Sequence, residues 1–394
     1  MERVQCCIAG GGPAGMMLGL LLARAGIRVA VLEKHRDFLR DFRGDTIHPS
    51  TLEVLHELGI LEEFLKLPHQ KVQELRGQVG ETLVTIADFR RLPVRCPYIA
   101  LIPQWDFLDF IARQGARYPG FGLRMESEVS GLLLRGGKVA GVKVGGREIE
   151  ADLVIGADGR SSTVRAAAGL EVKDLGAPID VLWFRLSRRP DDSDDTMGRF
   201  DRGSILVMLN RGEHWQCAFV IPKDSAQKVR DRGLEAFRAR IAALVPVAGE
   251  RVGEIASWDD VKLLTVQVNR LRRWYREGLL CIGDAAHAMS PVGGIGINLA
   301  IQDAVAAANI LRNGDFGLRS LQAVQARREL PTRLTQGFQV LVQNLILKRV
   351  LADEAGSAPL RPPLALRLLT GFEFVRRIPA RVVGMGFRPE HVRS

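Results

Sequence analysis

The strongest constraint on the fold is a glycine-rich turn between an apolar strand and an apolar helix near the N-terminus. Residues 3–9 (RVQCCIA) form a mostly apolar run, residues 10–15 (GGGPAG) match the pattern GxGxxG, and residues 16–25 predict a helix. A second apolar run over residues 28–32 ends at Glu33. A strand, a tight turn, a helix and a second strand in this order predict a βαβ unit of a Rossmann-like α/β fold.

Each part of this turn has a role in binding a dinucleotide. Gly10 permits the tight turn, and Gly12, which has no Cβ, lets the backbone approach a pyrophosphate. Gly15 lets the helix pack closely against the strand, while the helix N-terminus at Pro13 and Ala14 directs free N–H groups toward the phosphates. These five residues are therefore candidate contacts of a dinucleotide; a purely structural turn is the alternative.

An acidic and a basic residue follow the turn. Glu33 lies eighteen residues after Gly15, where a carboxylate accepts hydrogen bonds from the adenosine ribose, and Lys34 is a candidate contact beside it. Arg43 precedes an amphipathic helix expected over residues 51–58, and a cation there would lie over the phosphates and the open side of a flavin. The alternative is that Arg43 is one of several surface arginines.

Two later segments repeat the succession of strand, turn and helix. Asp158 and Gly159 follow one apolar strand, and Gly283 and Asp284 follow another that leads into an alanine-rich helix over residues 301–311. Backbone N–H groups at such a helix entry can bind an electron-rich ligand. An aspartate at the end of a strand can accept a ribose or ribityl hydroxyl.

The order and spacing of these three motifs resemble the flavoprotein aromatic hydroxylases of the para-hydroxybenzoate hydroxylase type. The resemblance runs over about residues 3–311, most of the chain. It implies non-covalent FAD, with its ADP part at the first motif, its ribityl chain at Gly283 and Asp284, and Asp158 near both FAD and the nicotinamide nucleotide. Further implied FAD contacts are Gln104 on a helix, Arg43 over the pyrophosphate, the backbone of Val129 at adenine and, along the flavin ring, Pro291, Gly293, Gly296, Ile297 and Asn298.

The fold that the resemblance implies is a discontinuous FAD-binding domain, interrupted by an antiparallel β-sheet for the substrate and followed by a helical segment. Alternating apolar patterns over residues 180–187, 203–209 and 215–221 agree with such a sheet. The expected domains are FAD binding over 1–72, 98–176 and 268–340, substrate binding over 73–97 and 177–267, and a basic C-terminal helical segment over 341–394. A chain of 394 residues is long enough for two lobes that share one active site.

The implied activity is FAD-dependent monooxygenation. NAD(P)H would bind transiently and reduce FAD, and O2 would then give a flavin hydroperoxide that hydroxylates an aromatic or polyketide-like small molecule. Two alternatives stay open: a FAD-dependent reductase or desaturase of an isoprenoid or lipid, and a FAD-binding module without turnover. No residue identifies itself as the catalytic acid or base.

Histidines and aromatic residues near the expected site favour structural roles. His48 lies beside Pro49 and His287 follows the Gly-Asp motif, and both suit packing better than proton transfer. Candidates for lining a substrate pocket are Trp183, Arg185, His214 and Trp215, for each of which ordinary packing is the stronger interpretation.

The net positive charge of the chain bears on which kinds of partner it binds. Lys and Arg outnumber Asp and Glu by 55 to 45, but no nucleic-acid-binding motif is present and only three tyrosines could stack on bases. An anionic cofactor, an anionic substrate or a membrane surface explains the excess more simply than nucleic acid. In the C-terminal segment, apolar residues recur at helical spacing: Leu364, Leu368, Leu369, Phe372 and Val375. This pattern predicts a helix that packs against the FAD domain or, alternatively, makes weak contact with a membrane surface.

The remaining composition indicates a cytoplasmic protein without a metal site. The five cysteines are an odd number without a CxxC pair, which argues against a disulfide framework and against a zinc site. No leader peptide is recognisable, and the most apolar stretch, residues 16–23, is much shorter than a membrane span. The oligomeric state is left open.

Overall fold

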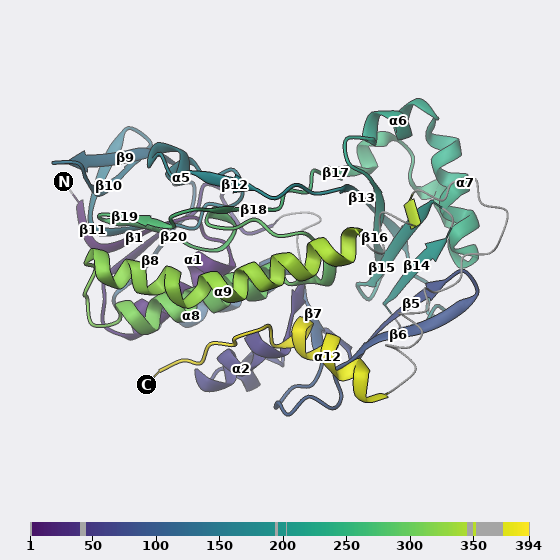
Figure 1. The fold of residues 1–394 in the computed structure, drawn as a ribbon, viewed down its shortest axis with the longest axis horizontal. Coiled ribbons are helices and arrows are strands. Elements are labelled where there is room, and N and C mark those ends of the chain that lie inside the picture. Colours follow the sequence, from purple (N-terminus) through teal and green to yellow (C-terminus); the bar gives the residue numbers. More distant parts are fainter. Residues whose placement is uncertain are drawn as a thin grey trace.

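The computed structural model describes residues 2–39, 45–193, 196–201, 203–344, 350–351 and 373–393. Arg43 lies outside these described residues, as do four of the five apolar positions of the predicted C-terminal helix, Leu364 to Phe372. The described chain forms two main β-sheets at opposite ends of its long axis, with helices packed around and between them (Figure 1).

The first sheet has eight strands and a parallel centre. Along the path β19-β20-β11-β1-β2-β8, all neighbours from β20 to β8 are parallel. The hairpin β9–β10 joins the sheet through β10, which pairs antiparallel with β11. The strands are β1 (Glu2–Ala9), β2 (Val29–Leu32), β8 (Phe121–Arg124), β9 (Val129–Arg135), β10 (Lys138–Val144), β11 (Arg147–Gly156), β19 (Tyr275–Arg276) and β20 (Leu279–Cys281).

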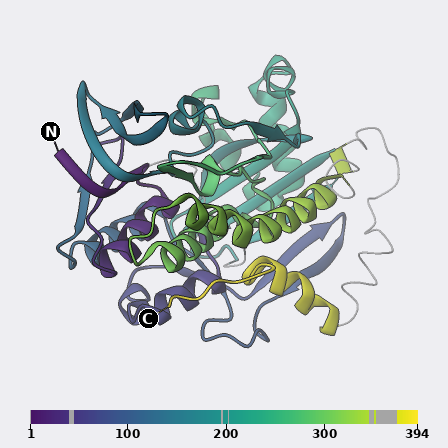
Figure 2. The ribbon, with the colours of Figure 1, turned by 60° about the vertical axis from the view of Figure 1, so that its left-hand side comes forward.

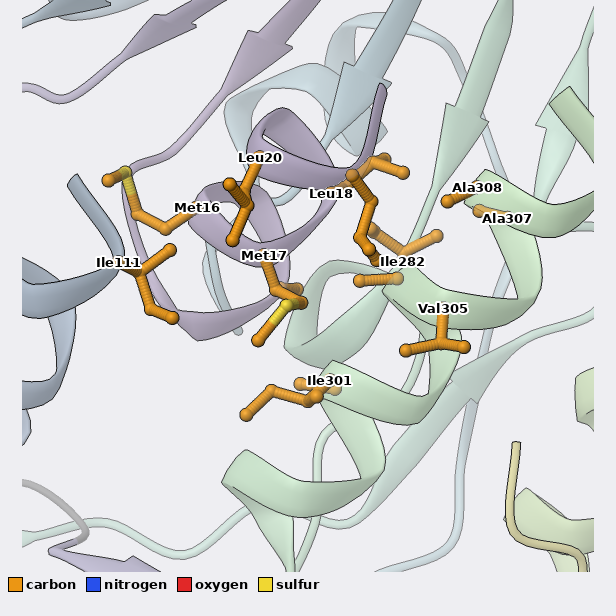
Figure 3. Packing of buried hydrophobic residues seen from close by; sticks show 14 of the residues in the cluster. Met16, Met17, Leu18, Leu20, Ile111, Ile282, Ile301, Val305, Ala307 and Ala308 are labelled. Atoms are coloured by element: carbon orange, nitrogen blue, oxygen red, sulfur yellow. The ribbon is translucent and has the colours of Figure 1, made fainter. Parts of the chain in front are cut away.

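Two apolar helices, α1 (Pro13–Arg24) and α8 (Gly296–Leu311), pack in the core beside this sheet. All residues of α1 from Ala14 to Ala23 are buried, which explains why this helix is apolar on every side. Figure 3 shows Met17 and Leu18 of α1 in one cluster with residues of α8 and with Ile111 of α4 (Gln104–Gly115). By length and hydropathy Val292–Leu311 could span a membrane, but 72% of its apolar window is buried, as expected of a core helix.

The second sheet has seven strands in the order β17-β13-β16-β15-β14-β5-β6. All its neighbours are antiparallel, as predicted, except β14 and β5, which are parallel. The β5–β6 hairpin, which comes from an earlier part of the chain, pairs with β14 and forms one edge of the sheet. The strands are β5 (Glu74–Val79), β6 (Thr82–Asp88), β13 (Ile179–Ser187), β14 (Met197–Asp201), β15 (Ser204–Asn210), β16 (His214–Pro222) and β17 (Lys262–Leu264).

One face of the second sheet is covered by α7 (Leu234–Leu244), which follows α6 (Ala226–Asp231). Phe237 of α7 contacts the rings of Phe184 and Phe219 edge-on, with centroids 5.7 and 5.3 Å apart. The opposite face belongs to another apolar cluster, which includes Val292, Val340 and Val350.

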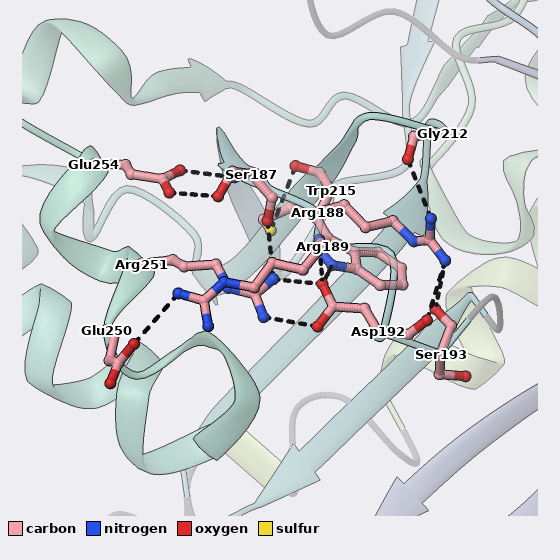
Figure 4. Close-up of polar contacts among 11 residues, drawn as sticks. Ser187, Arg188, Arg189, Asp192, Ser193, Gly212, Trp215, Glu250, Arg251 and Glu254 are labelled. Carbon is pink, nitrogen blue, oxygen red and sulfur yellow. Dashed lines mark hydrogen bonds and ion pairs between the residues drawn. The ribbon is translucent and has the colours of Figure 1, made fainter.

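A buried ion pair closes one end of this sheet (Figure 4). Arg251 Nη2 donates to Asp192 Oδ1 at 2.7 Å, and Arg251 Nη1 donates to the Ser187 carbonyl at 3.0 Å. Trp215 Nε1 donates to the same aspartate at 3.2 Å. Hydrogen bonds from Arg251 hold the pKa of Asp192 well below its ordinary value. Trp215 is therefore part of the packing of this sheet end, in line with the sequence interpretation.

Short elements complete the two lobes. A three-stranded sheet combines β3 (Thr46–Ile47), β7 (Ile99–Leu101) and β4 (Gln70–Val72), while β12 (Val172–Asp174) pairs with β18 (Asn269–Leu271). The short helices beside them are α2 (Pro49–Glu57), α3 (Leu61–Phe64) and α5 (Thr163–Ala167). We retain the predicted domain boundaries as a proposal, which is supported by the origin of all second-sheet strands in residues 74–88 and 179–264.

The C-terminal region packs on both lobes (Figures 1 and 2). The helix α9 (Leu318–Val342) contains Pro331. The helix α12 (Glu373–Gly384) buries Ala380 and Val383 in a cluster with residues of β6, β7 and α8. The described part of the segment is thus packed against both lobes. Apart from Val375, the positions from which its two alternative roles were predicted lie outside the described residues.

Candidate FAD site

The glycine-rich turn has the geometry that its sequence predicts. Gly10 has a φ of +106°, and a Cβ there would lie 2.3 Å from the Ala157 carbonyl oxygen. A Cβ on Gly15 would lie 2.0 Å from the Gly10 carbonyl oxygen, so only glycine permits this approach of α1. A Cβ on Gly12, the N-cap of α1, would meet no atom within 4 Å. The open space before a helix N-terminus has the character of a phosphate-binding site.

Glu33 closes one side of the turn. Its Oε2 accepts a hydrogen bond from the Gly11 N–H at 3.0 Å, and its Oε1 accepts one from the His35 N–H at 3.1 Å. The carboxylate is therefore fixed beside the turn, where a ribose could meet it. Lys34 is exposed, and Val129 is buried at the start of β9.

Asp158 lies in the turn that follows β11. Its Oδ2 accepts a hydrogen bond from the Val164 N–H at 3.0 Å and so orders the start of α5, together with Ser162, whose hydroxyl accepts from the Arg165 N–H at 2.9 Å. The other oxygen, Oδ1, is buried and has no hydrogen-bond partner among the described residues. A buried acceptor without a donor is costly in a folded protein, and a ligand hydroxyl would satisfy it.

Gly283 and Asp284 connect the three motifs. Gly283 has a φ of +58°, and a Cβ there would lie 3.1 Å from the Cβ of Ala14 in the first motif. Asp284 Oδ2 lies 3.8 Å from Arg160 Nη2, next to the second motif. The parallel pairing of β1, β2, β11 and β20 brings the carboxyl ends of these strands to one edge of the sheet, where α/β proteins of this type bind ligands.

The stretch after the Gly-Asp motif is held through Asn298. Its Oδ1 accepts hydrogen bonds from the His48 N–H at 2.9 Å and the Thr51 hydroxyl at 2.7 Å, and its Nδ2 donates to the Thr46 carbonyl at 3.1 Å. The Thr46 hydroxyl in turn donates to the Gly294 carbonyl at 2.9 Å. Because protein groups occupy the Asn298 amide, this stretch would meet a flavin ring through its backbone, as the resemblance implies.

The other residues of this stretch are more open. Pro291, Gly296 and Ile297 are half-buried, and Gly293, with a φ of +79°, is exposed. They lie between the Gly-Asp motif and α8, so a ligand could reach their backbone groups.

Two histidines near the site contact protein groups. His48 is fully buried, its Nδ1 lies 2.7 Å from the Val383 carbonyl oxygen, and burial lowers its pKa to about 4. His287 is also buried, with Nε2 2.5 Å from Asp303 Oδ2. Both contacts agree with the structural roles that the sequence favoured.

A buried ion pair between the lobes lies beside Gln104. Asp45, which precedes β3, accepts a hydrogen bond from the Gln104 N–H at 3.1 Å and lies 2.5 Å from Nη2 of Arg211 in the turn between β15 and β16. Both charged side chains are at most 7% exposed. Burial raises the pKa of Asp45 and lowers that of Arg211. The pair ties the predicted cofactor segment to the second sheet.

Sequence reasoning missed Asp45, Gly11, Asp303 and Arg211. Asp303 alone carried a signal, because it is an acidic residue inside an apolar, alanine-rich helix and lies among buried neighbours. The partners of Asp45 and Arg211 come from distant parts of the chain, so no local pattern marks them.

The face of the second sheet opposite α7 turns toward the first lobe. Val181, Trp183 and Val207 of this face belong to one apolar cluster with Val292 from the predicted ring-contacting stretch and Val340 of α9. The predicted ring-contacting stretch and the second sheet therefore meet at one place. The unpartnered Asp158 Oδ1, the free space at Gly12 and the fixed Glu33 carboxylate fit an anionic dinucleotide such as FAD.

Comparison with known proteins agrees with FAD binding. A family described as an FAD binding domain matches residues 3–315. The chain is 35% identical to 6-methylpretetramide 4-monooxygenase of Streptomyces rimosus over 408 aligned residues, which cover 100% of this chain and 94% of that protein. It is 26% identical to 3-demethoxyubiquinol 3-hydroxylase of Escherichia coli, over 79% of this chain and 80% of that one.

The fold is similar to that of solved structures. PqsL of Pseudomonas aeruginosa, described as a probable FAD-dependent monooxygenase, superposes with a TM-score of 0.76 at 22% identity, over 89% of this chain and 99% of PqsL. From the family match and the full-length similarity, this chain belongs to the family of FAD-dependent monooxygenases that share this FAD-binding domain.

Proposed function

We propose that this FAD-dependent monooxygenase hydroxylates a fused-ring aromatic polyketide. The observation that carries the proposal is the similarity to 6-methylpretetramide 4-monooxygenase along the whole chain. Because the similarity includes the second sheet, it bears on the substrate as well as on FAD.

The face of the second sheet opposite α7 supports an aromatic substrate. Trp183 and Val207 are half-buried there and offer apolar surface beside Val292. A planar ring system placed there would lie next to the stretch predicted to contact the flavin, and the apolar walls would exclude water from the reacting atoms.

Cationic groups at one end of the second sheet support a substrate with an acidic oxygen. Burial, Arg185 and Arg211 together lower the pKa of His214, so these three groups lie close enough to interact. Because Arg211 already pairs with Asp45, Arg185 is the group that would stabilise negative charge on a phenolic oxygen here.

We propose the following roles for the cofactor-binding residues. Bound FAD, reduced by NAD(P)H, supplies the electrons and the activation of O2. Gly12 and the N-terminus of α1 would hold the pyrophosphate, Glu33 the adenosine ribose and Asp284 the ribityl chain. NAD(P)H would bind transiently near Arg43 and Asp158.

The test uses the purified holoenzyme with 6-methylpretetramide, NADH or NADPH, and ¹⁸O₂. The expected result is NAD(P)H oxidation that depends on the polyketide, with one ¹⁸O atom in the product. A reduced or desaturated product without ¹⁸O would instead support the reductase alternative. Bound FAD without any substrate-stimulated NAD(P)H oxidation, across a panel of aromatic polyketides, would support a module without turnover.

We further propose a cytoplasmic location with, at most, weak contact between the C-terminal segment and membranes. The exposed side chains of Arg377, Ile378, Arg381 and Phe387 support such contact, because they combine positive charge with apolar surface. Cosedimentation with phosphatidylglycerol vesicles, and its loss in Arg377→Glu/Arg381→Glu, tests this contact.

A further inference from the structure

The last residues of the chain run along the FAD lobe and are fixed by side chains from three helices. The Val392 N–H donates to Glu57 Oε2 of α2 at 2.7 Å, and Asn309 of α8 donates to the His391 carbonyl at 2.8 Å. Glu390, only 4% exposed, accepts a hydrogen bond from Arg327 Nε of α9 at 2.8 Å. These specific contacts fix the segment to the FAD lobe.

A chain of buried charges leads from this tail to the Gly-Asp motif. Arg328 Nη1 donates to Glu390 Oε1 at 3.3 Å, and Arg328 Nε donates to Asp303 Oδ1 at 2.9 Å. Asp303 Oδ2 accepts from the Gly283 N–H at 3.1 Å and also contacts His287. Burial opposes ionisation of Asp303, but His287 and Arg328 outweigh it and hold its pKa below the ordinary value.

A second connection leads from the same tail to the other predicted flavin-contacting segment. The Val383 carbonyl oxygen lies 2.7 Å from His48 Nδ1, and the His48 N–H donates to Asn298 Oδ1. Asn298 also binds the Thr46 carbonyl. The tail is thus connected to both segments that are predicted to contact FAD.

We infer that residues 383–393 form a latch that positions the Gly283-Asp284 turn and the Thr46–Asn298 contact for FAD, and that Arg328 and Glu390 are positioning residues for FAD binding; this rests on the FAD site proposed above. The physical reason is that Arg328 binds one oxygen of Asp303 while the other oxygen accepts the Gly283 N–H. Without Arg328, His287 alone would orient the Asp303 carboxylate. The hydrogen bond that fixes the Gly283 N–H, and with it the ribityl-binding turn, would then be less well defined.

The structure offers a matched pair of neighbouring arginines for the test. Arg327 and Arg328 both contact Glu390, but only Arg328 also contacts Asp303. We expect Arg328→Met to raise the dissociation constant of FAD about tenfold or more, because a charge-assisted hydrogen bond behind the turn is lost. Arg327→Met should change this constant less than about threefold.

The measurements are FAD titration of each full-length apoprotein by flavin fluorescence, the visible spectrum of bound FAD, and the melting temperature of each apoprotein. If Arg328→Met does not fold, Glu390→Gln replaces it. We expect this variant to raise the dissociation constant of FAD about threefold to tenfold. A lower melting temperature of the apoprotein with an unchanged FAD constant and spectrum would overturn the latch and leave a structural role alone. Normal FAD binding by Gly12→Val would instead contradict the FAD site itself.

Discussion

At the scale of single residues, the first and third glycines of the GxGxxG motif serve the fold, and the second leaves space for a ligand. Gly10 and Gly15 lie where a Cβ would collide with backbone atoms, whereas a Cβ on Gly12 would meet no atom. In this turn, Gly10 and Gly15 are therefore needed for folding, and Gly12 is needed for ligand binding.

We expect Gly12→Val to lose FAD binding while its apoprotein melts close to the wild-type temperature. Gly15→Val should instead lower the melting temperature of the apoprotein, since its Cβ would lie 2.0 Å from the Gly10 carbonyl oxygen. At FAD concentrations about a hundred times the dissociation constant, wild-type protein should gain roughly 2.7 kcal/mol of stability that Gly12→Val lacks. Melting curves with and without FAD measure both effects, and an FAD-induced shift in Gly12→Val would refute the assignment.

A second residue-scale prediction concerns the buried His48. Its pKa is lowered by burial from 6.5 to about 4, so the unfolded chain binds a proton at a higher pH than the folded protein. Its contribution to stability is fully present above pH 6.5 and is lost as the pH falls from there toward 4. The loss is at most roughly 3 kcal/mol.

The variant His48→Asn should have a smaller fall in unfolding free energy over this pH range. Urea denaturation at several pH values between 4 and 7 measures the slope. Equal slopes in the variant and the wild type would show that His48 does not titrate as predicted.

At the scale of elements, the end of the second sheet depends on one buried ion pair. Arg251 and Asp192 are each at most 6% exposed, whereas the neighbouring pair of Arg189 and Glu250 is largely exposed. Arg251→Met should cost about 3–5 kcal/mol of stability, because Asp192 would remain buried and unpaired. Arg189→Met, as the matched control, should cost less than about 1 kcal/mol. Denaturant midpoints compare the two, and similar losses would contradict the expected effect of burial.

At the scale of the whole molecule, the Asp45–Arg211 pair joins the two lobes. Arg211→Met should cost about 3–5 kcal/mol near neutral pH, since it leaves a buried carboxylate unpaired. Burial already raises the pKa of Asp45, so this group destabilises the folded state increasingly as the pH rises from its unfolded value through its folded value. Without Arg211 that penalty grows, and the defect should be smaller at pH 5 than at pH 8.

The double variant Asp45→Asn/Arg211→Met should recover part of the lost stability, because no charge is left buried. Thermal melting at the two pH values gives the comparison. A double variant less stable than Arg211→Met would show that the pair contributes through shape rather than charge.

The sequence alone determined the strands, turns and helices that depend on residues next to one another in the chain. The turn from Gly10 to Gly15, the strand ending at Glu33 and the strand before Asp158 follow from apolar periodicity and glycine positions, and the structure has them within a few residues. Helix starts were less exact: α8 begins at Gly296 rather than residue 301, because the glycine-containing stretch before it is itself partly helical. The resemblance supplied the order of the lobes.

Only the tertiary structure decided how distant residues meet. The parallel pairing of β5 with β14, the ion pair of Asp45 with Arg211 and the path from Glu390 to Gly283 join positions that are far apart in the chain. No local sequence pattern predicts such contacts. A charged side chain is bound to one partner only after folding has buried it away from water, and its partner comes from a distant part of the chain. The sequence therefore determined where FAD could bind, and the three-dimensional packing decided what holds that site in place.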